Sequence, residues 1–103
     1  MSVQEFMMKS GVPIHLKGYA YIQEAIEYCI KEPDSKIGVV EMELAKAHNT
    51  TTACIERDIR TALNKGYPYM DEDIKQKLFR GKSKATTALF VKTISNAIRY
   101  KMI

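Results

Sequence analysis

The sequence predicts an all-α fold, a compact domain of six helices spanning residues 1–103. Apolar residues recur with helical spacing along nearly the whole chain, and no segment alternates with the period of two that marks a half-buried strand. A chain of 103 residues that is 46% hydrophobic is long enough for one core but not for two. Capping residues, prolines and glycines divide the apolar pattern into helix-sized segments. We therefore expect a single domain.

The first two helices are predicted around Val3 to Lys9 and from about Lys17 to Lys31. Gly11 and the Val12-Pro13 pair end the first helix, because a residue that precedes proline avoids the helical region. The second helix ends at Glu32-Pro33-Asp34. Its apolar residues form one stripe, made of Tyr19, Ile22, Ile26, Cys29 and Ile30.

A helix-turn-helix is predicted from about Glu41 to Gly66. Its first helix turns Leu44 and Ala45 inward, and Asn49 tolerates the left-handed conformation of a tight turn. Thr51 or Thr52 then caps a second helix, from about Thr52 to Gly66, by accepting a hydrogen bond from a free backbone amide. That helix has a buried stripe of Ile55, Ile59, Ala62 and Leu63. In such motifs the second helix enters the major groove of DNA.

The opposite face of this second helix carries Ala53, Arg57, Arg60, Thr61 and Asn64, with Glu56 at its edge. Arginine matches the guanine edge, asparagine pairs with adenine, and glutamate accepts from a cytosine amino group or pairs with Arg60 one turn on. On an isolated helix these would be ordinary solvent-facing residues, but the preceding helix and turn favour a role in DNA recognition. We predict that bases are contacted by Glu56, Arg57, Arg60, Thr61 and Asn64.

Positive charge gathers in the last third of the chain. Residues 1–74 carry 8 Lys+Arg against 12 Asp+Glu, whereas residues 75–103 carry 8 basic residues and no acid. Asp71-Glu72-Asp73 opens a fifth helix buried through Ile74 and Leu78. A basic loop follows at residues 81–84, and Thr86 or Thr87 caps a last helix. Charge alone is equally compatible with a solvated basic surface. Phosphate contacts are predicted for Thr51, Thr52, Lys82, Lys84 and Lys92.

Other classes of function lack support in the sequence. Cys29 and Cys54 lie within apolar helical patterns without metal-ligand spacing, so no metal, cofactor or disulfide is expected. His15 has no catalytic or metal-binding partners nearby and is interpreted as a structural residue that hydrogen-bonds at the start of the second helix. No nucleophile or phosphate-loop motif indicates an enzyme. Without a signal core or a membrane-spanning apolar run, a cytoplasmic, nucleoid-associated protein is expected.

Several stretches together resemble a known family. They are Gly11-Val12-Pro13-Ile14-His15-Leu16-Lys17-Gly18-Tyr19, Glu24-Ala25-Ile26, Leu44-Ala45-Lys46, Asn49-Thr50-Thr51 and Ile55-Glu56-Arg57 with Ile59-Arg60. They are similar to the C-terminal effector domain of the stage zero sporulation protein A family, response regulators of sporulation in endospore-forming Firmicutes. The resemblance implies a six-helix domain that binds a TGTCGAA-type DNA element, often as tandem copies, and contacts the sigma subunit of RNA polymerase. It places Glu56, Arg57 and Arg60 on the recognition helix.

The chain also departs from that family's pattern. These 103 residues include no receiver domain, so we expect either an excised effector domain or a stand-alone relative. His48 replaces an aromatic core residue, and Asp58 replaces a small apolar one. The segment from Tyr67 to Phe79, which faces the polymerase in the family, matches poorly. The alternative hypothesis is a protein-interaction module that antagonises the sigma subunit or a related regulator. Arg57 and Arg60 on the exposed face favour DNA, since such a module has no need of base-reading side chains.

Overall fold

The computed structural model describes residues 1–103 in full and confirms the all-α prediction. Six α-helices and one short 3-10 helix make up the fold, with no strand. None of these helices combines the length and apolar character needed to cross a lipid bilayer. The elements are α1 (Val3–Lys9), α2 (Lys17–Lys31), α3 (Ile37–Ala47), α4 (Thr52–Gly66), η1 (Tyr67–Tyr69), α5 (Glu72–Phe79) and α6 (Thr87–Arg99).

Short polar side chains begin four of the helices. Ser2 forms a capping box with Glu5 at the start of α1. Thr51, Asp71 and Thr86 each accept a hydrogen bond from a backbone amide in the first turn of α4, α5 and α6. Because these amides have no partner within the helix, each cap defines where its helix starts. Thr51 and Thr86 settle the two positions that the sequence left open between neighbouring threonines.

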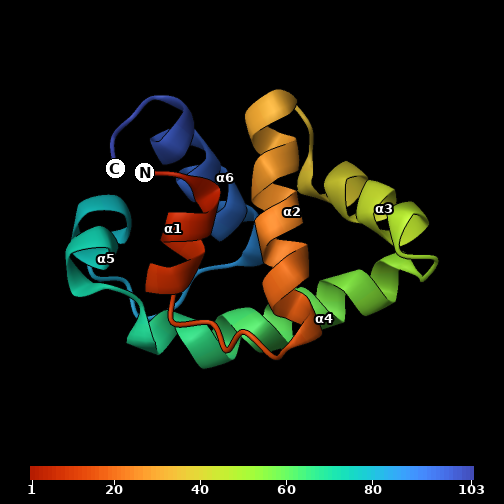
Figure 1. The fold of residues 1–103 in the computed structure, drawn as a ribbon, viewed down its shortest axis with the longest axis horizontal. Coiled ribbons are helices and arrows are strands. Elements are labelled where there is room, and N and C mark those ends of the chain that lie inside the picture. The colour runs from red at the N-terminus through yellow and green to blue at the C-terminus, as the bar shows by residue number, and fades with distance from the viewer.

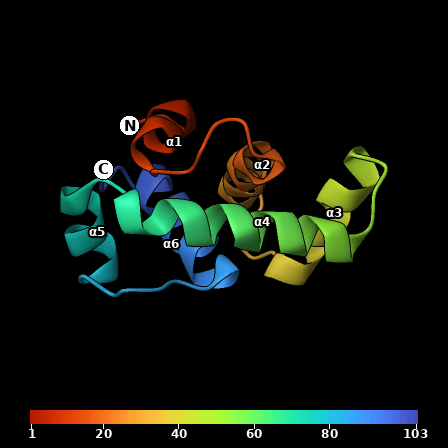
Figure 2. The same cartoon turned by 90° about the horizontal axis from the view of Figure 1, so that it is seen from below.

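Helix α2 is the central element, and the other helices are arranged around it. It packs against α1, α3, α4 and α6, and Figure 1 shows α4 crossing its lower end. Seen from below in Figure 2, α4 lies across the near side of the molecule along most of its length. One side of α4 is therefore covered by the body of the protein and the other faces outward.

The core joins all six α-helices in one cluster of 22 buried residues. At one end an aromatic group links α1, η1, α5 and α6, with ring centroids 5.9 Å apart for Phe6 and Phe90, 5.6 Å for Tyr67 and Phe79, and 5.7 Å for Phe79 and Phe90. Such pairs add roughly 0.5–1.5 kcal/mol each beyond the area that they bury. Phe79 is thus the residue that buries the end of α5, whereas Leu78, predicted for this role, is only half-buried.

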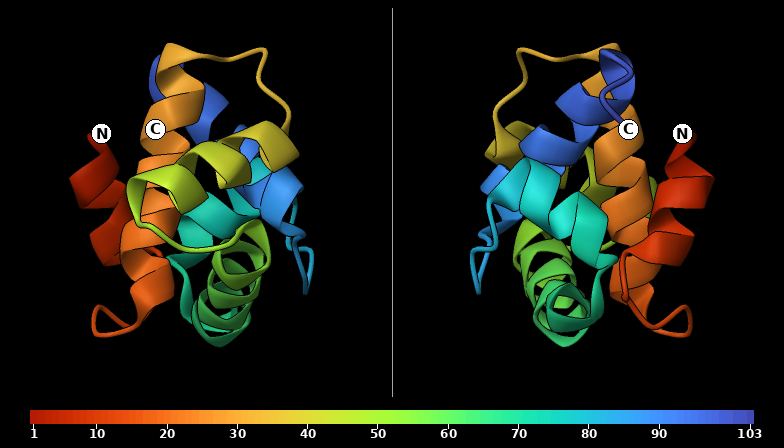
Figure 3. Two further views of the ribbon diagram at one scale, coloured as in Figure 1. Left: turned by 90° about the vertical axis from the view of Figure 1, so that its right-hand side faces the viewer. Right: turned by 90° about the vertical axis from the view of Figure 1, so that its left-hand side faces the viewer.

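Two connecting segments flank α4. Figure 3 shows the link between α1 and α2 on one side of α4 and the loop between α5 and α6 on the other, both at the level of α4. The second segment, residues 80–86, contains the basic loop. It begins with Arg80 and Gly81 in the left-handed region, at φ of 52° and 73°, and the Tyr67 hydroxyl donates to the Lys82 carbonyl at 2.8 Å. The loop is therefore anchored to the body beside α4.

Candidate nucleic-acid interface

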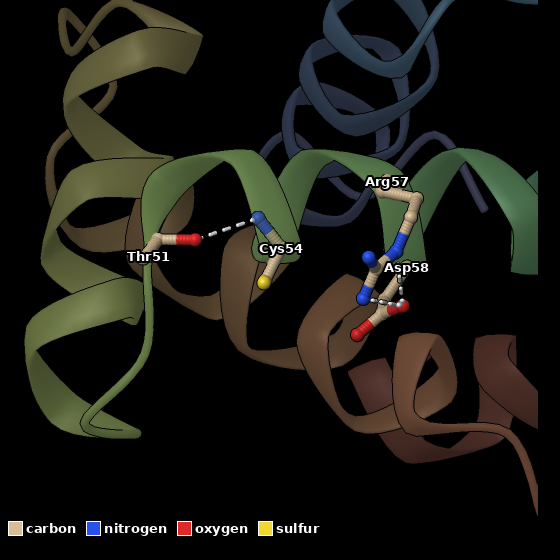
Figure 4. Close-up of polar contacts among 4 residues, drawn as sticks. All are labelled: Thr51, Cys54, Arg57 and Asp58. Atoms are coloured by element: carbon tan, nitrogen blue, oxygen red, sulfur yellow. Dashed lines mark hydrogen bonds and ion pairs between the residues drawn. The ribbon is translucent and has the colours of Figure 1, made fainter.

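Helices α3 and α4 are consecutive, packed against each other and joined by a tight turn at residues 48–51. Asn49 adopts the predicted left-handed conformation, with φ of 51°, and the Thr50 amide donates back to the Ala45 carbonyl at 2.9 Å. Thr51 then accepts from the Cys54 amide at 3.1 Å, as Figure 4 shows. The turn thus closes α3 and starts α4 within four residues, which is the arrangement predicted for a helix-turn-helix.

The two faces of α4 differ as the helical spacing predicts. Ile55, Ile59 and Ala62 are fully buried, and Leu63 is 2% exposed. The residues predicted to contact bases, Glu56, Arg57, Arg60, Thr61 and Asn64, are all exposed. The helix therefore presents one polar face, with two arginines about one turn apart, on the outward side of the molecule.

Close backbone contact fixes α4 against α2. At Gly18 of α2, an added Cβ would lie 2.2 Å from the Asp58 carbonyl oxygen and 2.5 Å from the Ala62 Cβ. Real side chains do not approach other atoms so closely, so α2 reaches α4 only because residue 18 has none. Asp58 is accordingly half-buried at the margin of this contact, where the helical angle places it.

Each arginine of the polar face has a carboxylate neighbour. The Nε and Nη2 atoms of Arg57 lie 3.4 Å from the Asp58 Oδ1 atom, and Figure 4 shows the guanidinium turned toward that side chain. One turn on, the Arg60 guanidinium forms an ion pair with Glu56. All of these side chains except Asp58 are exposed, so the pairs contribute little to stability. Each guanidinium group thus has one carboxylate neighbour and keeps further N–H donors for another ligand.

A groove of about 610 Å³ separates α4 from the basic loop. Its walls come from α3, from α4 and from residues 82–89, so that segments far apart in the sequence share one hollow. The exposed lysines 82 and 84 have no acidic partner within it. Its charged and amide residues are Glu41, Glu56, Arg60, Asn64, Lys82 and Lys84.

The predicted phosphate-binding residues are not all equivalent. Thr52, Lys82 and Lys84 are exposed, and Thr51 uses its hydroxyl as the cap of α4. Lys92, in contrast, is half-buried on α6, where its ammonium donates to the Pro33 carbonyl at 3.2 Å and to the Ser35 carbonyl. These hydrogen bonds hold the link between α2 and α3, and no interaction of Lys92 supports a role toward phosphate.

Both histidines differ from their expected surroundings. His15 is exposed and makes no hydrogen bond. The prediction that it forms a structural hydrogen bond at the start of α2 is therefore wrong. His15 lies in a shallow cleft with Lys17, Asp58 and Thr61. His48, which occupies an aromatic core position of the family pattern, stays at the surface. Its Nε2 atom lies 2.9 and 3.0 Å from the Glu24 carboxylate oxygens, and its ring packs edge-on against Tyr21. His48 therefore ties the turn to α2 by polar contacts.

Glu41 is the residue of this region that sequence reasoning missed. It is only 7% exposed although it is charged, and burial, followed by the nearby Glu56 carboxylate, raises the pKa of its carboxyl above the usual glutamate range. The signal was present in the sequence. Glu41 follows Ile37 by four residues and precedes Ala45 by four, which places it on the inward stripe of α3.

An all-α domain with a packed helix pair that presents an arginine-bearing helix beside a basic loop is consistent with a helix-turn-helix, the class of fold found in many DNA-binding regulators of transcription. The comparison with known families gives the particular one. A family model described as Sporulation initiation factor Spo0A C terminal matches residues 3–98. The chain belongs to this family, the DNA-binding effector domain of a sporulation response regulator, and the resemblance inferred from the sequence is confirmed.

Proposed function

We propose that the protein recognises a TGTCGAA-type element in double-stranded DNA by inserting α4 into the major groove. The observation that carries the proposal is the polar face of α4, where Arg57 and Arg60 stand opposite the buried stripe and Arg60 also lines the groove shared with the basic loop. Guanine offers two acceptors in the major groove, which match the paired donors of an arginine. Thr61 and Asn64 extend this face, and Glu56 is suited to accept from a cytosine amino group.

The DNA backbone is proposed to lie along the groove between α4 and the basic loop. Lys82 and Lys84 form no ion pair there, and Thr52 is exposed at the start of α4. Contacts of this kind position the protein without reading sequence. Thr51 contributes to this interface by capping α4 at the end of the turn. Lys92 is left out of this proposal because backbone carbonyls already surround its ammonium.

A gel-shift titration tests the recognition step. The protein is titrated against a duplex that contains the TGTCGAA element and against a scrambled duplex of equal length and composition. Specific DNA-binding domains favour their site by roughly a thousandfold or more at physiological salt. Equal affinity for the two duplexes would contradict the proposal and would favour a protein partner, with the sigma subunit of RNA polymerase as the first to test by direct binding.

We further propose that copies of the domain associate on tandem elements. DNA that holds two copies side by side raises their effective concentration, so that a weak protein contact becomes favourable. Binding to a double site is then cooperative, and insertion of about 5 base pairs between the elements removes the gain by rotating one copy away from the other. A stable dimer in the absence of DNA, measured by sedimentation, would contradict this arrangement.

A further inference from the structure

Glu41 is a largely buried glutamate on the wall of the groove beside α4, and its carboxyl group has no ion-pair or hydrogen-bond partner. The residue is 7% exposed. Removing a carboxylate from water is costly unless hydrogen bonds or an opposite charge compensate for it. A charged Glu41 is therefore poorly tolerated, and its pKa is raised for that reason. Many other residue types would fill such a position at less cost, so the acid invites a functional explanation.

The other charged residues that line this groove come from two elements. Helix α4 contributes Glu56 and Arg60, which form an ion pair with each other, and the basic loop contributes Lys82 and Lys84. Helix α6 adds only uncharged residues to the groove, since its Lys92 is held by the Pro33 and Ser35 carbonyls. In the free protein the positive charge of Arg60 compensates Glu56, although the Glu56 carboxylate still raises the pKa of Glu41.

DNA binding removes this compensation. If Arg60 leaves Glu56 to donate to a base, the two carboxylates of Glu41 and Glu56 stay behind at the same groove. Lys82 and Lys84 turn to phosphates at the same time, and those phosphates bring further negative charge. Two neighbouring carboxylates without a counter-charge raise the pKa of one of them, and the buried group is the one that gives up its charge.

We propose that Glu41 is a positioning residue for base recognition, which takes up a proton when Arg60 exchanges Glu56 for DNA. The inference rests on the proposed role of α4 in the major groove. Binding to the specific element is then linked to proton uptake, and Glu41 acts through Glu56 and Arg60 without touching DNA. Scrambled DNA, which attracts the lysines but does not draw Arg60 from Glu56, takes up fewer protons.

The sign of the pH dependence follows from linkage. A group whose pKa is higher in the complex than in the free protein binds more protons in the complex. Specific affinity is therefore highest below the pKa of Glu41 in the free protein, and it falls as pH rises between that pKa and the one in the complex. Since one carboxyl is involved, specific affinity falls by at most about tenfold per pH unit within this interval.

The test compares three proteins on specific and scrambled duplexes between pH 5 and 8: the natural chain, Glu41→Gln and Glu43→Gln. Glu43 is the matched control because it lies on the same helix, its removal changes the net charge equally, and its carboxylate pairs with Lys46 outside this groove. The ratio of specific to scrambled affinity is recorded, so that contributions of the two histidines common to both duplexes cancel. Calorimetry in two buffers of different ionisation enthalpy counts the protons taken up.

In the natural chain and in Glu43→Gln, the affinity ratio should fall with rising pH, and up to about one more proton should be taken up on the specific duplex than on the scrambled one. In Glu41→Gln the ratio should be flat and this extra uptake absent. A ratio that is independent of pH in the natural chain, or that keeps its pH dependence in a folded Glu41→Gln protein, overturns the inference alone. Equal affinity for both duplexes at every pH overturns the proposed recognition and this inference with it. The proton count on the natural chain decides the question even if Glu41→Gln fails to fold.

Discussion

The arginines of α4 and the lysines of the basic loop are both cationic, but they are held in different ways. Arg57 and Arg60 each lie against a carboxylate on their own helix, whereas Lys82 and Lys84 extend from a loop without an acidic neighbour. An arginine gains most from DNA where a base offers two acceptors that match its paired donors. A free lysine gains from any phosphate. The comparison indicates that discrimination resides in α4 and general affinity in the loop.

The sharpest test of this division is to replace Arg57 or Arg60 with alanine. Each change should cost roughly 1–3 kcal/mol on the specific duplex and little on the scrambled one, because the paired hydrogen bonds to guanine disappear while the phosphate interactions remain. Lys31→Ala is the control, since it also removes one positive charge but lies at the end of α2 away from α4 (Figure 1). Equal reductions on both duplexes would show that the arginines bind phosphate.

The converse test removes Lys82 and Lys84 together. Affinity for specific and scrambled DNA should fall by the same factor, because an interaction with phosphate carries no sequence information. The slope of log affinity against log salt should become shallower by about one unit for each phosphate that is no longer neutralised. An unchanged slope would place the loop away from the DNA backbone. It would contradict the conclusion that general affinity resides in the loop.

A smaller effect is expected from the cap that starts α4. Thr51→Ala removes the acceptor of the Cys54 amide and should lower the free energy of unfolding by about 1 kcal/mol. Thr52→Ala is the matched control, because Thr52 is exposed and caps nothing. Thermal denaturation of the two variants measures the difference. Equal stability would mean that the packing of α4 alone determines where it begins, independently of its cap.

The smallest expected effect concerns stability and pH. Because the pKa of Glu41 is raised in the folded protein, its folded form binds more protons than its unfolded form. The charged form of Glu41 therefore lowers the stability of the fold. This loss of stability is absent at low pH and grows as pH rises through the folded pKa. Glu41→Gln should match the natural chain in melting temperature near pH 4 and exceed it near pH 8. A constant difference would show that the charge of Glu41 is not what matters.

Local patterns in the sequence were sufficient for most of the fold. The helical period fixed α1 and α2 to the residue, and the chemistry of Asn49 and Thr51 located the turn, because each of these depends on neighbours along the chain. Interactions between distant segments left no such pattern. The hydrogen bonds of Lys92 to the link after α2 join residues 57 and 59 positions apart. They could not be anticipated from spacing.

The candidate site divides along the same line. The polar face of α4 could be predicted from the helical spacing of its residues, and its exposure agrees with that prediction. The groove that brings Glu41 together with Lys82 and Lys84 arises only when α3, α4 and the basic loop are folded together. Glu41 shows the limit most clearly. Its position on the inward stripe of α3 could be predicted from the sequence, but the charged residues that share its groove could not.

The close approach at Gly18 has a consequence for the orientation of α4. Side chains in a core can be exchanged for others of similar volume, and the helices that they separate then shift slightly. At Gly18, α2 lies directly against the Asp58 carbonyl and the Ala62 side chain of α4, so any side chain at residue 18 would push the two helices apart. The direction in which the domain presents its arginines therefore depends on a glycine at this position.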